Sequence, residues 1–198
     1  MSDVVKVNTF SIVIPTVPEN YVLLKRCVSS LFKFASPDYE HEIIIVPNNW
    51  EGFSTPVNKG LKQAQGDIIL ILNDDTEFYG TGWEDKVVKE FENQSCGITG
   101  HYLSKQHEKY SALWCTFIKP EVFDKIGLLN EEMNLYSQDI YFGWKSLKEG
   151  YITTFIDIPV KHYTSSTTSR IAHEDNERLK KESKEIFKKI TGIEHDDV

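Results

Sequence analysis

Short apolar segments alternate along the chain with stretches of helical spacing, and this alternation predicts the elements of the fold. Four short segments rich in β-branched residues are typical of strands: Phe10–Ile14, Glu42–Val46, Asp67–Leu72 and Gly97–Tyr102. Leucine and valine recur at helical spacing over 21–32, and a shorter helical pattern is expected to end at Gly66. Strands that alternate with helices predict an α/β sandwich around a mostly parallel sheet, whose ligands bind beyond the carboxyl ends of the strands.

The second half of the chain is less regular. Helical and strand patterns continue there at Trp83–Phe91, Ser111–Ile118, Pro120–Ile126, Ser137–Lys148 and Tyr151–Ile156. The polar stretch 164–170 lacks an apolar anchor and predicts a mobile loop, whereas the amphipathic pattern over about 173–190 predicts a terminal helix packed on the domain. Because no repeat or linker interrupts the pattern, a single domain over 1–198 is expected.

Composition narrows the class of partner. The formal net charge is −8, and no basic stripe offsets it, so nucleic acid is excluded as a partner. An anionic phosphate ligand would therefore need a divalent metal carried by carboxylates. The three cysteines lie far apart, which favours reduced core thiols. With no apolar run near the ~20 residues of a membrane span and no signal peptide, we expect a soluble, cytoplasmic protein without a transmembrane segment.

The segment from Asp67 to Thr76 carries the strongest chemical signal. A buried strand runs directly into Asn73, Asp74 and Asp75. Carboxylates at such a position are costly unless they are paired or bind a metal, and Mg²⁺ and Mn²⁺ favour carboxylate and phosphate oxygens. A solvated turn at the end of a strand is the alternative interpretation.

Two flanking motifs give this segment a family context. The run from Asn58 through Gly60 to Gly66 leads into the strand, and the first strand ends in Pro15-Thr16. Together with Asn73-Asp74-Asp75, where Asn73 stands at the first acidic position of the family's DXD motif, these features resemble the family 2 glycosyltransferases of the GT-A fold. The resemblance covers roughly 10–163. It implies a single GT-A domain with a nucleotide-binding half at about 8–102 and an acceptor and catalytic half at about 103–163.

The resemblance also implies a set of donor-binding residues. The residues that it assigns to the nucleotide sugar are Pro15, Thr16, Pro18, Asn48, Asn58 and Asp74. Asn48 stands where the family often has an Asp that reads the edge of a uracil or thymine base. An Asn side chain both donates and accepts hydrogen bonds and can still pair with uracil, so a UDP- or dTDP-sugar is favoured.

The same resemblance implies a metal site and a catalytic base. Asp75 would be the main ligand of Mn²⁺ or Mg²⁺, and His162 would complete the site. Asp139 would take the proton of the acceptor hydroxyl, with Gln138 in place of the usual Glu. Electrostatic stabilisation of a helix N-terminus is the alternative role for Asp139. The loop at 164–170 would close over the diphosphate, helped by Arg170 or Lys161.

These features point to an inverting, metal-dependent glycosyltransferase whose acceptor is a glycan, a glycoprotein or another hydroxyl compound. A nucleotidyltransferase would need a glycine-rich loop where 15–18 has no glycine, and a haloacid dehalogenase phosphatase would need an Asp in place of Asn73. A non-catalytic nucleotide-sugar or carbohydrate-binding module of the same fold remains open. Trp50 and Trp114 are candidates for stacking on sugar faces, with core packing as the alternative.

Overall fold

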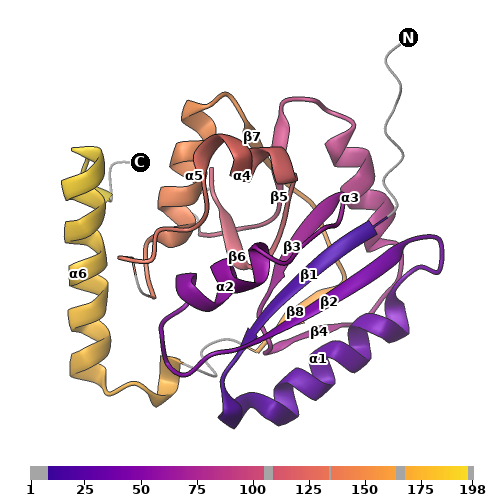
Figure 1. Ribbon diagram of the computed structural model, residues 1–198, viewed down its shortest axis with the longest axis horizontal. Coiled ribbons are helices and arrows are strands. Elements are labelled where there is room, and N and C mark those ends of the chain that lie inside the picture. Colours follow the sequence, from indigo (N-terminus) through magenta and orange to yellow (C-terminus); the bar gives the residue numbers. More distant parts are fainter. Residues whose placement is uncertain (1–8, 105–108, 134, 164–167, 196–198) are drawn as a thin grey trace.

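A computed structural model describes residues 9–104, 109–133, 135–163 and 168–195. The described chain is a three-layer sandwich in which helices cover both faces of a six-stranded sheet (Figure 1). The prediction of an α/β sandwich with a mostly parallel sheet is confirmed. Within these ranges no helix is both long enough and apolar enough to cross a lipid bilayer.

The elements follow one another along the chain in alternation. Their order is β1 (Thr9–Thr16), η1 (Pro18–Asn20), α1 (Tyr21–Phe34), β2 (Glu40–Pro47), α2 (Ser54–Leu61), β3 (Ile68–Leu72), β4 (Thr76–Phe78), α3 (Trp83–Phe91), β5 (Cys96–Tyr102), β6 (Ser111–Ile118), α4 (Pro120–Ile126), α5 (Gln138–Lys148), β7 (Ile152–Phe155), β8 (Val160–His162), η2 (Thr168–Arg170) and α6 (His173–Thr191).

The central sheet has the strand order β2-β1-β3-β6-β5-β7. β2, β1 and β3 are parallel neighbours, and β5 and β7 are parallel as well. β6 runs antiparallel to both β3 and β5, so it is the one reversed strand of this sheet. The carboxyl ends of β1, β2 and β3 therefore meet at one edge, which is where a ligand is expected in an open α/β sheet.

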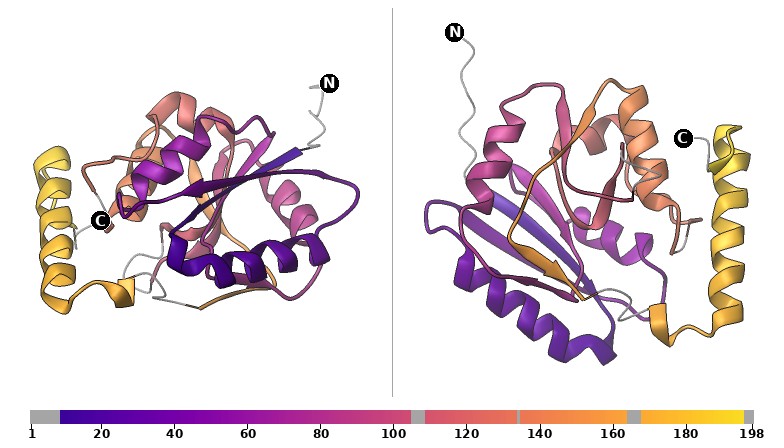
Figure 2. Two further views of the ribbon diagram at one scale, coloured as in Figure 1. Left: turned by 60° about the horizontal axis from the view of Figure 1, so that its bottom comes forward. Right: turned by 180° about the vertical axis from the view of Figure 1, so that it is seen from behind.

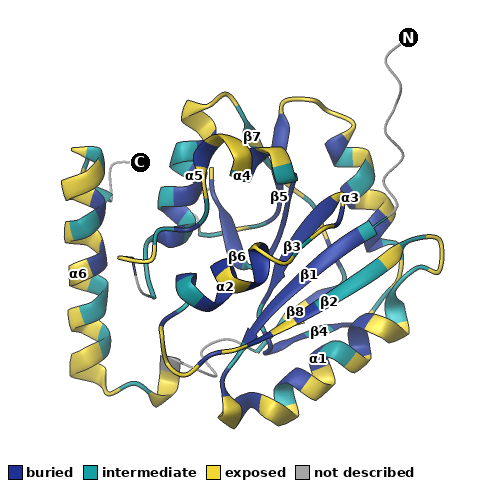
Figure 3. Cartoon of the chain, viewed as in Figure 1, coloured by how far each residue is buried: buried dark blue, intermediate teal, exposed yellow. Residues whose placement is uncertain are grey.

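Alternation along the strands divides the core between the two faces of the sheet. Phe10, Ile12 and Ile14 of β1 pack with α1 and α3, whereas Val13 points to the opposite face and packs with α2, α4 and α5. Side chains of successive strand residues point to opposite faces, so both layers of helices are held by the same strand. The central strands are buried along most of their length (Figure 3).

Gly66 has a different role from the predicted one. The helix that precedes it ends at Leu61, and Gly66 lies beyond it against the first strand. A Cβ atom at Gly66 would lie 2.6 Å from the backbone nitrogen of Ser11 and 2.9 Å from the carbonyl oxygen of Thr9. Glycine is needed here because the two backbones approach closely, not because it ends a helix.

Two further parts of the chain lie outside the sandwich. β4 and β8 form a separate two-stranded antiparallel ribbon, which the sequence patterns did not predict. α6 lies on the outside of the molecule, beside α5 (Figure 2), and Phe187 fixes it there through ring contacts with Tyr141 and Trp144.

Of the predicted loop at 164–170, residues 164–167 lie outside the described residues, and Thr168–Arg170 forms a short 3₁₀ turn.

Candidate active site

A cavity of about 610 Å³ opens where the carboxyl ends of β1, β2 and β3 meet. Its size is in the range of pockets that bind small molecules and cofactors. Its walls come from the strand ends, the β6–α5 region and the start of α6. The lining includes Pro15, Thr16, Val17, Asn48, Trp50, Gly52, Phe53, Asn73, Asp74, Leu103, Ala112, Leu113, Trp114, Leu135, Gln138, Asp139, His162, Ile171, Asp175, Arg178 and Leu179.

Asp75 and His162 lie together at the edge of this cavity. Nε2 of His162 is 3.0 Å from Oδ1 of the buried Asp75. The β4–β8 ribbon explains the contact: Thr76 pairs with His162 in the ladder, and the backbone N–H of Tyr163 donates to the carbonyl of Asp75. The His162 ring also stacks on Trp114, with centroids 4.5 Å apart, which fixes its orientation.

This pair suits a divalent cation that also binds a ligand. No cluster of three or more His, Cys, Asp or Glu side chains arranged for a metal ion is found in the described part of the chain. A carboxylate and an imidazole leave most coordination positions of Mn²⁺ or Mg²⁺ to phosphate oxygens and water. Mg²⁺ is usually held in this way, by one or two carboxylates and the phosphates of the substrate. The residues present therefore fit a cation shared with a diphosphate, but not a closed protein cage.

Asp74 belongs to a second polar network. Its Oδ1 accepts a hydrogen bond from Nδ2 of Asn20 at 3.0 Å, and Oδ1 of Asn20 accepts one from Arg170 at 2.6 Å. Burial raises the pKa of Asp74 to about 6, while hydrogen bonds from Thr16 and Asn20 act in the opposite direction. The charge of Asp75 adds to the increase and that of Arg170 opposes it. The network thus ties the turn after β1 to the segment before α6.

Asp139 lies across the cavity, in the first turn of α5. Its Oδ2 accepts a hydrogen bond of 3.0 Å from the backbone N–H of Leu113 on β6. Burial raises the pKa of the Asp139 carboxyl, and hydrogen bonds from the backbone N–H groups of Leu113 and of Asp139 itself act against this shift. Ser137, just before the helix, has φ 66°, which a residue other than glycine rarely adopts. A partly buried carboxylate that still faces the cavity has the environment of a proton acceptor.

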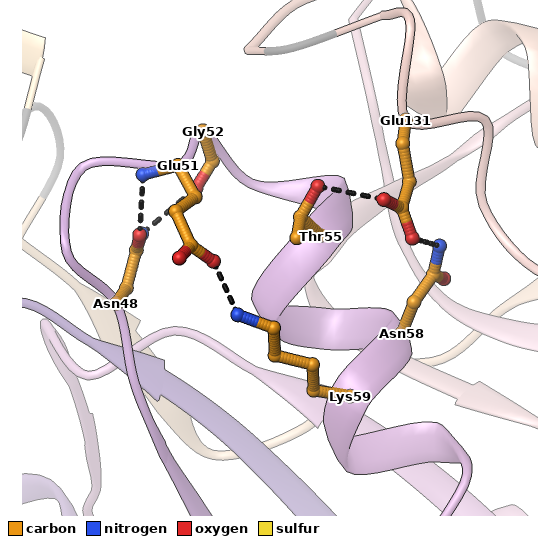
Figure 4. Close-up of polar contacts among 7 residues, drawn as sticks. All are labelled: Asn48, Glu51, Gly52, Thr55, Asn58, Lys59 and Glu131. Atoms are coloured by element: carbon orange, nitrogen blue, oxygen red, sulfur yellow. Dashed lines mark hydrogen bonds and ion pairs between the residues drawn. The ribbon is translucent and has the colours of Figure 1, made fainter.

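Asn48 closes the loop that follows β2. Its Nδ2 donates to the carbonyl of Gly52 at 2.8 Å, and its Oδ1 accepts from the N–H of Glu51 at 2.9 Å (Figure 4). Glu51 in turn forms an ion pair with Lys59 of α2. The predicted base-reading side chain therefore lines the cavity, but much of its amide is used to shape the loop that carries Trp50.

Asn58 and Pro18 lie outside the cavity lining. The buried Asn58 amide donates to the carbonyl of Leu129 at 2.9 Å and accepts from its N–H at 3.0 Å, and it also donates to Glu131 (Figure 4). Asn58 thus fastens α2 to the segment that leads to α5. Pro18 begins the 3₁₀ turn that ends at Asn20, so it positions the partner of Asp74.

Several contacts of the site had no clear signal in the sequence. Asn20 contacts Asp74 across 54 positions, and Arg170 contacts Asn20 across 150 positions. Asp175 and Arg178 of α6 also line the cavity, although no motif singled them out. No local pattern marks such distant contacts.

Comparison with solved structures identifies the fold. GalNAc-T7, solved with UDP, GalNAc and Mn²⁺, superposes with a TM-score of 0.66 at 15% identity, over 79% of this chain and 44% of that one. TarS from S. aureus, in complex with UDP, gives a TM-score of 0.57 at 15% identity, over 75% and 57% of the two chains. PcManGT, a mannosyltransferase from Pyrobaculum calidifontis with GDP-Man and Mn²⁺, gives 0.56 at 12% identity, over 76% and 55%.

These relatives are longer proteins, since the chain spans less than two thirds of each of them. Comparison with curated protein sequences gives no match. The sequence profile of the family described as "Glycosyl transferase family 2" matches residues 47–175, which is more than half of the chain. That segment holds Asp74, Asp75, Asp139 and His162, the acidic and imidazole groups described above. The chain belongs to glycosyl transferase family 2.

Proposed function

We propose that the chain is an inverting, metal-dependent glycosyltransferase domain. It passes a sugar from a nucleoside diphosphate donor, with UDP- or dTDP-sugar favoured, to a hydroxyl of a glycan, a glycoprotein or another acceptor. The observation that carries the proposal is the convergence of Asp74, His162 and Asp139 on one cavity at the carboxyl ends of the strands. In this proposal, the donor half of the single domain covers about 8–102 and the catalytic half about 103–163.

The order of the strands supports an orientation for the donor. The ends of β2 and β1 lie on one side of the cavity, β3 lies in the centre, and β6 with α5 lies on the other side. A nucleoside diphosphate sugar has its diphosphate between the base and the sugar. If Asp75 and His162, beyond the end of β3, bind the diphosphate, the base lies toward β1 and β2 and the sugar lies toward Asp139.

Asp75 and His162 would hold the cation, and the diphosphate and water would fill its remaining positions. A bound Mn²⁺ or Mg²⁺ supplies positive charge that offsets the negative charge of the departing diphosphate. This need is marked in a chain with a net charge of −8, because its own field disfavours anionic ligands. Mn²⁺ is present in two of the similar structures, those of GalNAc-T7 and PcManGT.

Asp139 acts as the general base in this proposal. Its carboxylate accepts the proton of the acceptor hydroxyl while the oxygen forms a bond to the anomeric carbon. The bond between that carbon and the diphosphate oxygen breaks in the same step, and the nucleoside diphosphate leaves. Attack on the face opposite the leaving group inverts the configuration at the anomeric carbon. The raised pKa of the Asp139 carboxyl favours this role, because a stronger base takes a proton more readily.

A thermal-shift panel of UDP-, dTDP- and GDP-sugars, each with and without Mn²⁺, tests donor binding and metal dependence together. Ligands that bind the folded state raise the unfolding temperature in proportion to the logarithm of their concentration over Kd. We expect the largest increase with a UDP- or dTDP-sugar and Mn²⁺. Release of the nucleoside diphosphate from the donor distinguishes an enzyme from a non-catalytic module, which would bind the donor without turnover. The absence of any shift across the panel would contradict the proposal.

A further inference from the structure

Trp50 differs from the other three tryptophans of the chain. Trp83, Trp114 and Trp144 each pack against other aromatic rings, and Trp83 is fully buried. Trp50 is 45% exposed and makes no ring contact within the described ranges, although it lines the cavity. An indole ring left open at a cavity wall is not used for core packing. It offers a flat apolar face to whatever enters the cavity.

The backbone at Trp50 is held in an unusual conformation. Its φ is 61°, in the left-handed region that bulky residues rarely adopt. The surrounding loop is closed by both polar atoms of the Asn48 amide, which bond to Glu51 and Gly52, and the ion pair of Glu51 with Lys59 anchors it to α2 (Figure 4). A strained backbone conformation of this kind persists only where several surrounding contacts hold it in place. Such conformations are found most often at functional sites. The loop is thus built to present Trp50.

The position of the loop indicates which part of a ligand meets the ring. Asn48 continues the ladder of β2 with β1, since its N–H donates to the carbonyl of Thr16 at 2.8 Å. Trp50 therefore belongs to the β1–β2 side of the cavity, whereas Asp139 lies on the β6 side, against Leu113. With the diphosphate near the end of β3, the ring on the β1–β2 side meets the base and not the transferred sugar.

We propose that Trp50 stacks on the base of the nucleotide and is a principal determinant of donor affinity. This inference rests on the proposed function. The Asn48 amide is largely engaged in closing the loop, so the base is recognised more through its face than through its edge. Asn48 then acts mainly as the positioning residue that holds the loop beneath Trp50.

Equilibrium titrations of the whole chain test this inference. The ligands are UMP, UDP and ribose 5-phosphate, the last of which lacks a base, and the variants are Trp50→Ala, Trp50→Phe and the matched control Trp144→Phe. Stacking of a base on an aromatic side chain makes Trp50→Ala bind UMP and UDP about 5- to 150-fold more weakly. We expect Trp50→Phe to retain most of the affinity, Trp144→Phe to bind as the wild type does, and ribose 5-phosphate to be unaffected by any of these changes.

Tryptophan fluorescence gives a readout that does not depend on catalysis. A base that stacks on Trp50 quenches its emission, so UMP should quench the wild type and Trp144→Phe but not Trp50→Phe. Because Trp50→Phe keeps an aromatic ring, this comparison remains valid if Trp50→Ala folds poorly.

Three outcomes would overturn the inference. Equal affinity of wild type and Trp50→Ala for UMP and UDP would remove Trp50 from base recognition and leave the proposed function standing. A loss confined to UDP-sugars would assign the ring to the sugar. Failure of the wild type itself to bind any of these nucleotides would contradict the proposed function as well.

Discussion

The carboxylates on the two sides of the cavity have different hydrogen-bond partners. On the donor side, Asp74 and Asp75 contact polar side chains: Asn20, backed by Arg170, bonds to Asp74, and His162 bonds to Asp75. On the proposed catalytic side, Asp139 accepts a hydrogen bond from the backbone N–H of Leu113, and the apolar residues Ala112 and Leu135 line the neighbouring cavity wall.

Under the proposed function, this difference lets one residue type serve two purposes. A carboxylate with movable polar partners can exchange them for a cation or a ribose hydroxyl at little cost. A carboxylate held by a backbone N–H keeps its position, and its burial makes it a stronger base. In the proposed mechanism, the different surroundings of these carboxylates would separate donor binding from proton transfer, as in enzymes that use two carboxylates in different roles.

The replacement Asp139→Asn has the largest expected effect. It preserves size and removes the proton acceptor, so sugar transfer should fall by about 10²–10⁴-fold. Donor binding, measured by calorimetry with UDP, should persist because Asp139 lies on the other side of the cavity. The exposed Asp124→Asn on α4 is the matched control. A variant that transfers sugar at the wild-type rate would remove Asp139 from its role and leave a helix N-terminal role in its place.

Loss of the Asp75–His162 pair on the donor side should slow sugar transfer. Loss of metal stabilisation raises the barrier by several kcal/mol, so His162→Ala or treatment with a chelator should slow transfer roughly 10²–10³-fold. Added Mn²⁺ should restore the chelated wild type but not the variant. His173→Ala, an exposed histidine at the start of α6, is the matched control. Full activity in the presence of excess chelator would show that the pair has a structural role.

The pH profile sharpens the contrast between the two sides. Burial raises the pKa of Asp139, so the active, deprotonated form is lost on the acid side at a higher pH than for an exposed Asp. Below that pKa, the rate should fall by about tenfold for each pH unit. A profile of kcat/KM that stays flat down to the pKa of an ordinary Asp would contradict the assignment.

The same shift has a consequence for stability. A carboxyl with a raised pKa in the folded state contributes stability below its unfolded pKa, and this contribution is lost as the pH rises through the folded pKa. In Asp139→Asn the side chain does not ionise, so this loss of stability does not occur. We therefore expect the variant to be at least as stable as the wild type at neutral pH by thermal unfolding, and a marked decrease would point to a structural role for the charge.

The replacement Asn58→Ala has the smallest expected effect. It tests whether Asn58 stabilises the fold or belongs to the nucleotide pocket. Asn58→Ala leaves the N–H and the carbonyl of Leu129 without their partner, which should cost roughly 1–3 kcal/mol. In a domain of this size the unfolding temperature should fall by about 2–4 °C for each kcal/mol. Gln63→Ala, an exposed position just beyond α2, is the control. If Asn58→Ala instead weakened UDP binding with no change in stability, Asn58 would belong to the nucleotide pocket.

The sequence predicted those parts of the fold that repeat a local pattern. The β-branched residues of β1, the helical spacing of α1 and the pattern over Pro120–Ile126 each mark an element, and the structure has an element at each place. β4 and β8 were missed because three residues are too few to show a period. This omission matters for the site, because the pairing of Thr76 with His162 in that ribbon places the imidazole beside Asp75.

The remaining features of the site depend on side-chain geometry, which local patterns do not contain. Asn48 was identified by its place after β2, but its engagement with Glu51 and Gly52 follows from the loop conformation. Asn58 was identified by its motif, yet its partner Leu129 lies 71 positions away. Position and motif thus identified Asn48 and Asn58 as site candidates, and the structure shows which groups they bind.

The central claim is that Asp75 and His162 bind a cation together with the diphosphate of the donor. Calorimetric titration of UDP into the wild type and into His162→Ala, each with and without Mn²⁺, tests it most directly. We expect Mn²⁺ to strengthen UDP binding in the wild type and to have little effect in the variant. Equal affinity for UDP with and without Mn²⁺ in the wild type would contradict the claim.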